Sequence, residues 1–327
     1  MIPESICVEN PVMDFNLLIN KMPETDGFAR LNDYSWQGGG NVSSGAVASA
    51  RLGVKTAVAG VVGDDAFGDF CVADFKRHGI DVSHIAVDKG SKTTFVICLA
   101  EMEKMSRSIL GKGGTIRQLT AQELDRDFIT SAKYLHLGHM GPNQVQAAKW
   151  AKESGVIVLD DAGAYNKDTH EHTGLIDVFI ASEHYYKGLF DDEDYKSNMK
   201  KIQARGPQIV IVTLGAKGCV GIDGDNYFEI PAFKGLDIVD TTGAGDVFHG
   251  AFICAMNNGW GTEKCARFSS AVSAIKCTRL GGRAAIPDFE TVMSFLAGGA
   301  INYTEIDERV DFYRDGLINS MKLTFEK

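Results

Sequence analysis

Short runs rich in Val, Ile and Leu alternate with amphipathic stretches along this chain, and the alternation limits the possible folds more than any other feature. Several runs are apolar at every position, as expected for strands covered on both faces of a sheet. The expected strands are 56–62, 95–99, 134–138, 156–160, 178–181 and 209–214. Apolar residues three or four apart predict helices at 44–52, 67–78, 143–153, 192–204, 245–257, 264–278 and 289–297. The sequence therefore predicts an α/β fold with a mostly parallel sheet and helices on both faces.

Size, charge and composition exclude some classes of function for this chain and indicate its domain organisation. The 327 residues carry a net charge of −10, which disfavours a broad basic face for nucleic acid. No segment approaches 18 uncharged apolar residues, and the first residues lack a secretory leader pattern, so we expect a cytoplasmic protein without a membrane span. The seven cysteines are scattered and are expected to be reduced. We expect one α/β domain over residues 1–300 and a helical C-terminal extension over 301–327.

Two insertions interrupt the alternation, at residues 14–37 and 89–114. Both contain strand-like segments and turn residues but no helix of useful length. They are expected to pair into one small β-sheet that acts as a lid over a neighbouring site. Ordinary surface hairpins are the alternative.

The strongest chemical signal is the run Asp240-Thr241-Thr242-Gly243-Ala244-Gly245-Asp246, which follows a strand-like approach at 236–239 and opens an apolar helix. Small residues at such a turn let backbone N–H groups converge, and the helix N-terminus adds partial positive charge. This arrangement predicts an anion hole formed by Gly243, Ala244 and Gly245. A carboxylate beside it, Asp246, is suited to accept a proton during phosphoryl transfer. An ordinary N-capping Asp on a buried helix is the alternative.

Residues 240–253 as a whole resemble the C-terminal signature of the ribokinase-like (PfkB-type) carbohydrate kinases, and the resemblance extends over about residues 6–298. Gly38-Gly39-Gly40 leads into a helix that ends near Gly53, as in the first signature of that family. The resemblance implies a three-layer ribokinase-like fold, with ATP and Mg²⁺ as cofactors. It assigns Asp14, Gly39 and Gly40 to the sugar.

The same resemblance places the nucleotide on a second set of residues. Thr213, Gly215, Lys217 and Gly218 match the strand and turn of the nucleotide site, and Ser270 lies on the helix that covers the adenine. Gly243 and Gly245 contact the phosphates in this scheme.

The chain departs from the family pattern at three positions. Ser44 stands where the first signature has asparagine, and Asn41, one helical turn earlier, is the candidate to reach a substrate hydroxyl. The element that orders Mg²⁺-bound water lacks its asparagine, so Glu183 is offered as a ligand through water. Ser270 replaces an asparagine on the adenine helix. The sequence leaves activation by a monovalent cation such as K⁺ open.

Arg107, in the second insertion, is suited to bind a substrate carboxylate or phosphate, although a solvated arginine is equally compatible with its position. We expect an ATP-dependent kinase that phosphorylates a hydroxymethyl group of a small sugar, favouring a fructose-type ketose or a 2-keto-3-deoxy sugar acid. A ribokinase, a nucleoside kinase, or a non-catalytic sugar-binding homologue are the alternatives. The exposed edges of the small sheet predict a homodimer joined through the lids.

Overall fold

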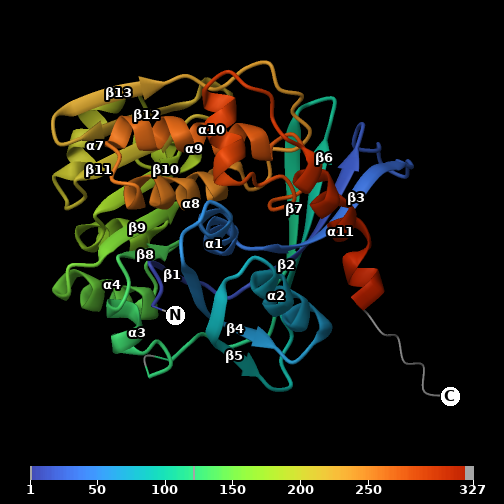
Figure 1. Ribbon diagram of the computed structural model, residues 1–327, viewed down its shortest axis with the longest axis horizontal. Coiled ribbons are helices and arrows are strands. Elements are labelled where there is room, and N and C mark those ends of the chain that lie inside the picture. The colour runs from blue at the N-terminus through green and yellow to red at the C-terminus, as the bar shows by residue number, and fades with distance from the viewer. Residues whose placement is uncertain (1, 121, 321–327) are drawn as a thin grey trace.

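A computed structural model describes residues 2–120 and 122–320 and contains two separate sheets (Figure 1). In this part of the chain the large sheet has nine strands in the order β13-β12-β11-β10-β9-β8-β1-β4-β5. All neighbours from β11 to β5 are parallel, while β12 and β13 are antiparallel. The strands are β1 Ser5–Val8, β4 Thr56–Gly63, β5 Asp81–Asp88, β8 Tyr134–Leu137, β9 Ile157–Ala162, β10 Val178–Ser182, β11 Ile209–Thr213, β12 Cys219–Asp223 and β13 Asn226–Ile230.

Side chains alternate between two cores on opposite faces of this sheet, which explains the fully apolar strands. In β10, Ile180 packs into one core while Phe179 and Ala181 pack into the other, as the two-residue period of a strand requires. The first core is covered by α1 Asn41–Arg51, α2 Ala66–Arg77, α8 Ala244–Asn257, α9 Thr262–Lys276 and α10 Phe289–Leu296. The second is covered by α3 Arg126–Thr130, α4 Pro142–Glu153, α6 Glu183–Lys187 and α7 Tyr195–Gln203. The expected three layers are confirmed.

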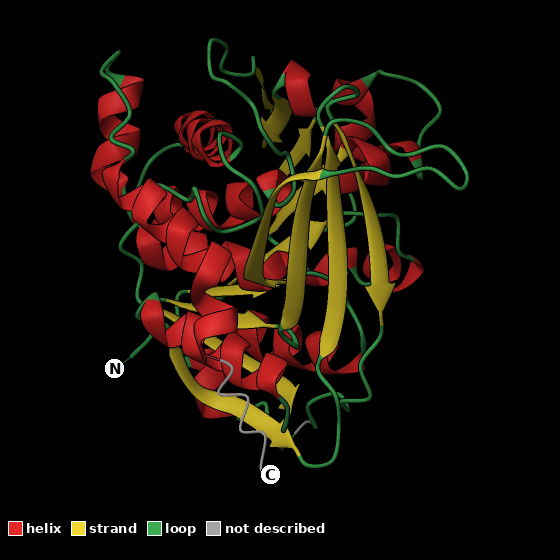
Figure 2. Cartoon of the chain, turned by 90° about the vertical axis from the view of Figure 1, so that its right-hand side faces the viewer, coloured by secondary structure: helices red, strands yellow, loops and turns green. Residues whose placement is uncertain are grey.

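The two insertions form the small sheet, whose strand order is β3-β2-β6-β7. Its strands are β2 Val12–Ile19, β3 Leu31–Gly39, β6 Thr94–Glu101 and β7 Ser106–Lys112. Parallel pairing of β2 with β6 joins the two insertions, from Val12 opposite Thr94 to Ile19 opposite Glu101. Every residue of β7 is exposed, and in Figure 2 these strands stand in front, with the helices beside and behind them. The small sheet is thus confirmed, and its action as a lid remains a prediction.

Within the expected C-terminal extension at 301–327, α11 Thr304–Ser320 packs against β3 of the small sheet, and residues 321–327 lie outside the described part of the chain. Short segments complete the chain: α5 Lys167–Glu171, η1 Thr173–Leu175 and η2 Gly215–Lys217. No helix within the described residues is long and apolar enough to cross a membrane. All seven cysteines are free and buried, as expected for small apolar residues.

The expected strand at 236–239 is wrong. This segment is a loop that runs beside the end of α9, where the Val239 and Asp240 N–H groups both donate to Cys277 O at 2.8 and 3.2 Å. Among the described residues this segment pairs with no strand, because its N–H groups donate to the end of a helix instead.

Candidate active site

The turn before α8 has a backbone shape that only glycine adopts without strain. Gly243, the N-cap of α8, has φ +76°, and a Cβ there would lie 2.8 Å from the Cα of Gly282. Close packing against the 281–282 loop therefore requires glycine at this position. Gly245 faces open space, with no atom near the position of a Cβ.

Two of the three expected amides at this turn are free. The Ala244 N–H donates to Thr241 O at 3.2 Å, whereas the Gly243 and Gly245 N–H groups have no backbone acceptor among residues 2–120 and 122–320. Unpaired N–H groups at a helix N-terminus attract anions. The turn can therefore hold a phosphate through Gly243 and Gly245, while Ala244 shapes the turn.

Asp246 lies in the first turn of α8, beside these amides, and is partly buried. Burial and the neighbouring Asp161 carboxylate raise its pKa to about 6, against the opposing effects of His249, Arg107 and Lys276. A carboxylate with a pKa near neutrality is suited to act as a general base.

Two further carboxylates near Asp246 come from β2 and from the loop after β1, Asp14 and Glu9. Burial raises the pKa of Asp14 to about 7; Arg283 opposes this shift, and Asp246 and Glu9 add to it. Burial likewise raises the pKa of Glu9 to about 7, although Ser43 donates its backbone N–H to Glu9 Oε2 at 2.7 Å. Asp14 makes no side-chain hydrogen bond with any described residue, so its oxygens can accept from a ligand.

Glycines before α1 leave room for these carboxylates. A Cβ on Gly39 would lie 2.1 Å from Asp14 Oδ1, and one on Gly40 would lie 2.4 Å from Glu9 Oε2. Gly40 also has φ +91°, which favours glycine. The structure thus brings Asp14, Gly39 and Gly40 together, and their contact with a sugar remains a prediction.

Asn41, the first residue of α1, lies beside Asp161 and lowers its pKa by a side-chain hydrogen bond, but burial still raises that pKa to about 7. Asp161 in turn lies 3.4 Å from His249 Nδ1. Asn41 therefore connects the glycine turn with the carboxylate that acts on Asp246.

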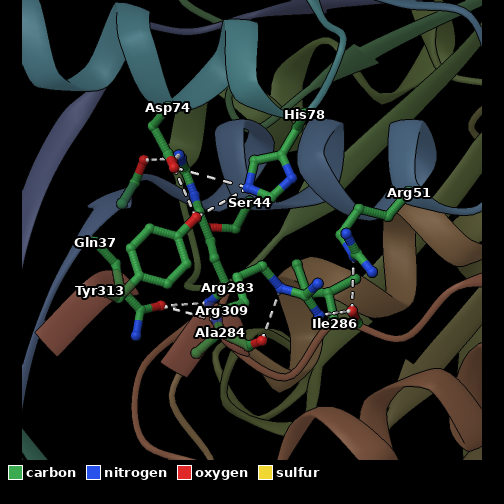
Figure 3. A network of polar contacts seen from close by, with 11 residues as sticks. Gln37, Ser44, Arg51, Asp74, His78, Arg283, Ala284, Ile286, Arg309 and Tyr313 are labelled. Atoms are coloured by element: carbon green, nitrogen blue, oxygen red, sulfur yellow. Dashed lines mark hydrogen bonds and ion pairs between the residues drawn. The ribbon is translucent and has the colours of Figure 1, made fainter. Parts of the chain in front are cut away.

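A buried polar network holds the turn at Gly38-Gly39-Gly40, before α1, in place (Figure 3). Arg283, which is fully buried, donates from Nη2 to Gly39 O at 2.8 Å and pairs through Nη1 with Asp74 Oδ2 at 2.7 Å. Gln37 Oε1 accepts from the Arg283 N–H at 2.6 Å. From α11, Tyr313 donates its hydroxyl to Asp74 Oδ1 at 2.6 Å. The loop after α9 and the C-terminal helix are thus fastened to Gly39.

The residues expected around the nucleotide lie at the end of β11, on the same edge of the sheet as the carboxyl ends of β9 and β10. Thr213 ends β11, and Gly215 and Lys217 bound the η2 turn that follows it, before Gly218. Gly218 has φ +103°, and a Cβ there would lie 2.0 Å from Ile230 O. Ser270 on α9 lies next to this region, with Oγ 3.8 Å from Cys219 Sγ. Ligands bind at this edge in open α/β sheets.

Glu183 directly follows β10 and lies on the same edge, where Ser182 is paired with Thr213. Its carboxylate contacts Lys187 Nζ at 2.8 Å. Within the described chain no three His, Cys, Asp or Glu residues are grouped so as to hold a metal ion. These residues fit a Mg²⁺ ion carried mainly by nucleotide phosphates and water.

Arg107 reaches across from β7 of the small sheet to the anion-binding turn. Its Nη1 lies 3.4 Å from Thr241 Oγ1, and its charge lowers the pKa of Asp246. The guanidinium is exposed, so it is available to a ligand lying between the small sheet and the turn.

Four residues of this region were missed by the sequence analysis: Glu9, Asp161, Lys276 and Arg283. A signal existed for Asp161, because Asp160-Asp161 ends a buried strand, where acids are out of place unless they serve a site. No such signal marks Lys276, since a lysine in the last turn of a helix is ordinary. The places of Glu9 and Arg283 in the site depend on contacts with residues far away in the sequence, which the sequence does not show.

Solved structures define the class of fold first. A putative ribokinase from Agrobacterium tumefaciens superposes with a TM-score of 0.80 at 24% identity, covering 90% of this chain and 98% of that one. The ribokinase of Arabidopsis thaliana complexed with ribose and ATP gives a TM-score of 0.76 at 24% identity, covering 90% and 99%. The fold is therefore that of the ribokinases.

The family follows from sequence. The model of the pfkB family of carbohydrate kinases matches residues 5–288, and the chain belongs to that family. A similar protein is the ATP-dependent ribose-1-phosphate kinase of Halopiger xanaduensis, 29% identical over 87% of this chain and 95% of its own. Fructokinase-2 of Solanum lycopersicum is 28% identical over 87% of this chain and 95% of its own. The predicted enzyme class, a sugar kinase, is confirmed.

Proposed function

We propose that this protein transfers the γ-phosphoryl group of ATP to a hydroxymethyl group of a small, negatively charged sugar derivative. One observation carries the reaction: Asp246, with its pKa raised to about 6, lies in the same helical turn as the free amides of Gly243 and Gly245. Phosphoryl transfer needs these two elements together, a base at the attacking hydroxyl and donors for the migrating charge.

In the proposed reaction, Asp246 accepts the proton of the sugar hydroxyl as its oxygen attacks the γ-phosphorus. The Gly243 and Gly245 N–H groups donate to the oxygens of the transferred group. Magnesium bound to the nucleotide supplies charge neutralisation. Asp14 accepts hydrogen bonds from sugar hydroxyls, and its free carboxylate oxygens beside Gly39 suit that role because carboxylates bind hydroxyl pairs strongly.

The reaction is tested by Asp246→Asn, which keeps the shape of the side chain and removes the base. We expect turnover to fall by about 10³-fold or more, while ATP binding and the melting temperature stay near those of the unsubstituted protein. A coupled assay of ADP release over a panel of sugars, sugar acids and nucleosides measures it. Near-normal turnover in Asp246→Asn would refute the base. Ligand binding without any turnover in the unsubstituted protein would favour a non-catalytic homologue.

Arg107 supports an anionic substrate. An exposed guanidinium next to the phosphate-binding turn attracts a second negative group, and a relative named as a ribose-1-phosphate kinase acts on a phosphosugar. We therefore place 2-keto-3-deoxy sugar acids and phosphosugars ahead of fructose-type ketoses, with ribose and nucleosides after them.

This ranking is tested with Arg107→Gln and the charge-conserving Arg107→Lys. We expect Arg107→Gln to raise the KM of a sugar acid by 10-fold or more and leave the KM of a neutral ketose within 2-fold, with Arg107→Lys in between. A rise in the KM of ATP instead, whatever the sugar, would assign Arg107 to the nucleotide.

We also propose a homodimer formed through the small sheet. β7 is exposed along its whole length, and Ile109 and Leu110 on it are 57% and 61% exposed. A second sheet edge or face would cover these apolar side chains. Light scattering at micromolar concentration should give twice the mass of one chain, and the Ile109→Lys variant should give the mass of a single chain. A monomer mass for the unsubstituted protein would exclude the dimer.

A further inference from the structure

Lys276, the last residue of α9, is completely buried behind the anion-binding turn. A lysine is almost never fully buried unless its charge is paired. Only one other charged side chain, Arg283, is among the largest fully buried side chains of the described residues. The burial of Lys276 therefore calls for a partner.

The partners are backbone carbonyls and not carboxylates. Lys276 Nζ donates to Asp240 O at 3.1 Å and to Thr242 O. In the described part of the chain no Asp or Glu oxygen lies within ion-pair distance of Nζ. The nearby Asp240 carboxylate is held by amides, with Oδ1 accepting from Thr242 N at 2.9 Å and Oδ2 from Gly281 N at 2.8 Å. Backbone carbonyls around one positive charge are also how proteins bind a bare K⁺ ion.

These carbonyls fix the direction of the site's amides. In a planar trans peptide, the C=O and the following N–H point in opposite directions. Because Thr242 O points to Lys276, the Gly243 N–H points away from the ammonium, and no described backbone group accepts from it. An ammonium behind the turn therefore aligns a donor in front of it, and its charge also lowers the pKa of Asp246.

We propose that the Lys276 ammonium is a built-in monovalent cation, which orients the anion-binding turn and makes phosphoryl transfer independent of added K⁺. This inference rests on the proposed kinase reaction. It makes Lys276 a positioning residue, because it acts on the phosphate through the Gly243 amide.

The first test is the cation dependence of the unsubstituted enzyme. Turnover in K⁺, Na⁺ and tetramethylammonium salts of equal ionic strength should agree within 2-fold. Severalfold activation by K⁺ would overturn the proposal, and this measurement does not depend on any variant folding.

The second test removes the ammonium in two ways. Lys276→Ala leaves space for an ion, whereas Lys276→Met fills the space with a neutral chain. Both should lose about 10²-fold or more in kcat, the usual cost of a misplaced donor to a developing anion. Addition of 100 mM K⁺ or NH₄⁺ should restore Lys276→Ala at least 10-fold and leave Lys276→Met unchanged. Near-normal turnover of Lys276→Met in the absence of K⁺ would overturn the proposal, as would equal rescue of both variants.

A third measurement needs no turnover. K⁺ or NH₄⁺ should raise the melting temperature of Lys276→Ala and not that of the unsubstituted protein, since a ligand that binds only the folded state stabilises it. Equal shifts for both would overturn the proposal. Because this readout is independent of substrate, failure of the kinase assignment would appear as loss of turnover on every sugar with the melting response intact.

Discussion

The proposed sugar side and phosphate side of the site each contain one fully buried cation among the described residues, and the two are neutralised differently. On the sugar side, Arg283 pairs with the Asp74 carboxylate at 2.7 Å and holds Gly39 O at 2.8 Å (Figure 3). On the phosphate side, the hydrogen-bond partners of the Lys276 ammonium within residues 2–120 and 122–320 are the carbonyls of Asp240 and Thr242. The two residues are seven positions apart, on either side of the loop that packs against Gly243.

The difference separates a structural role from an electrostatic one. Arg283 has several fixed donors in one plane and a carboxylate partner, so its contacts fasten elements together while Asp74 compensates part of its charge. Backbone dipoles hold Lys276 without cancelling its charge, which stays available to the phosphate site. Loss of Arg283 should therefore be felt mainly in stability, and loss of Lys276 mainly in turnover.

The largest expected effect on stability comes from Arg283→Met. This change leaves Asp74 buried without its main partner, and we expect the free energy of unfolding to fall by about 3–5 kcal/mol. Urea unfolding measures it. Arg283→Met combined with Asp74→Asn, which removes the stranded charge, should recover most of the loss. If Lys276→Met destabilises the protein as much as Arg283→Met does, the proposed division between the two cations is wrong.

A second, smaller effect tests whether the network of Arg283 and Asp74 extends to α11, which lies outside the family match. Tyr313→Phe removes the hydroxyl that contacts Asp74 at 2.6 Å and His78 Nε2 at 2.9 Å. We expect a loss of about 1.5–3 kcal/mol, as for other hydrogen bonds to a charged group. Tyr303→Phe, whose hydroxyl makes no hydrogen bond with a described residue, is the matched control and should change stability by less than about 0.5 kcal/mol. An equal effect of both would show that the Tyr313 hydroxyl does not fasten α11 to Asp74.

The same two cations show what could be predicted from the sequence. The alternation of apolar runs predicted the large sheet and its layers, because that pattern depends only on local residues and burial. The family resemblance placed Asp14, Gly39 and Asp246 on the elements that meet at the site. Lys276 and Arg283 escaped prediction, because their roles depend on contacts with residues 34 to 244 positions away. The loop at 236–239 was mistaken for a strand, since its apolar residues pack against the end of α9.

The smallest expected effects are shifts in pH dependence, and they distinguish the two sides directly. Asp246 must be ionised to accept a proton, so kcat should fall as the pH drops through about 6. Asp14, whose pKa is raised to about 7, should add an acid limb to kcat/KM for the sugar. Because both pKa values are raised in the folded protein, these carboxylates favour folding most below pH 4, and that contribution is lost as the pH rises through 6 to 7.

Removal of Lys276 should shift only the acid limb of kcat, and removal of Arg283 should shift only the acid limb of kcat/KM. A nearby positive charge favours the ionised carboxylate, so its loss raises the carboxylate pKa. Lys276→Met should shift the kcat limb of its residual activity to higher pH by a fraction of a unit. The stable double variant of Arg283 and Asp74 should shift the kcat/KM limb in the same direction. Both sets of profiles come from initial rates between pH 5 and 9. If either variant moves both limbs equally, the two cations act on one shared electrostatic cluster, and the sugar side and the phosphate side are not separate.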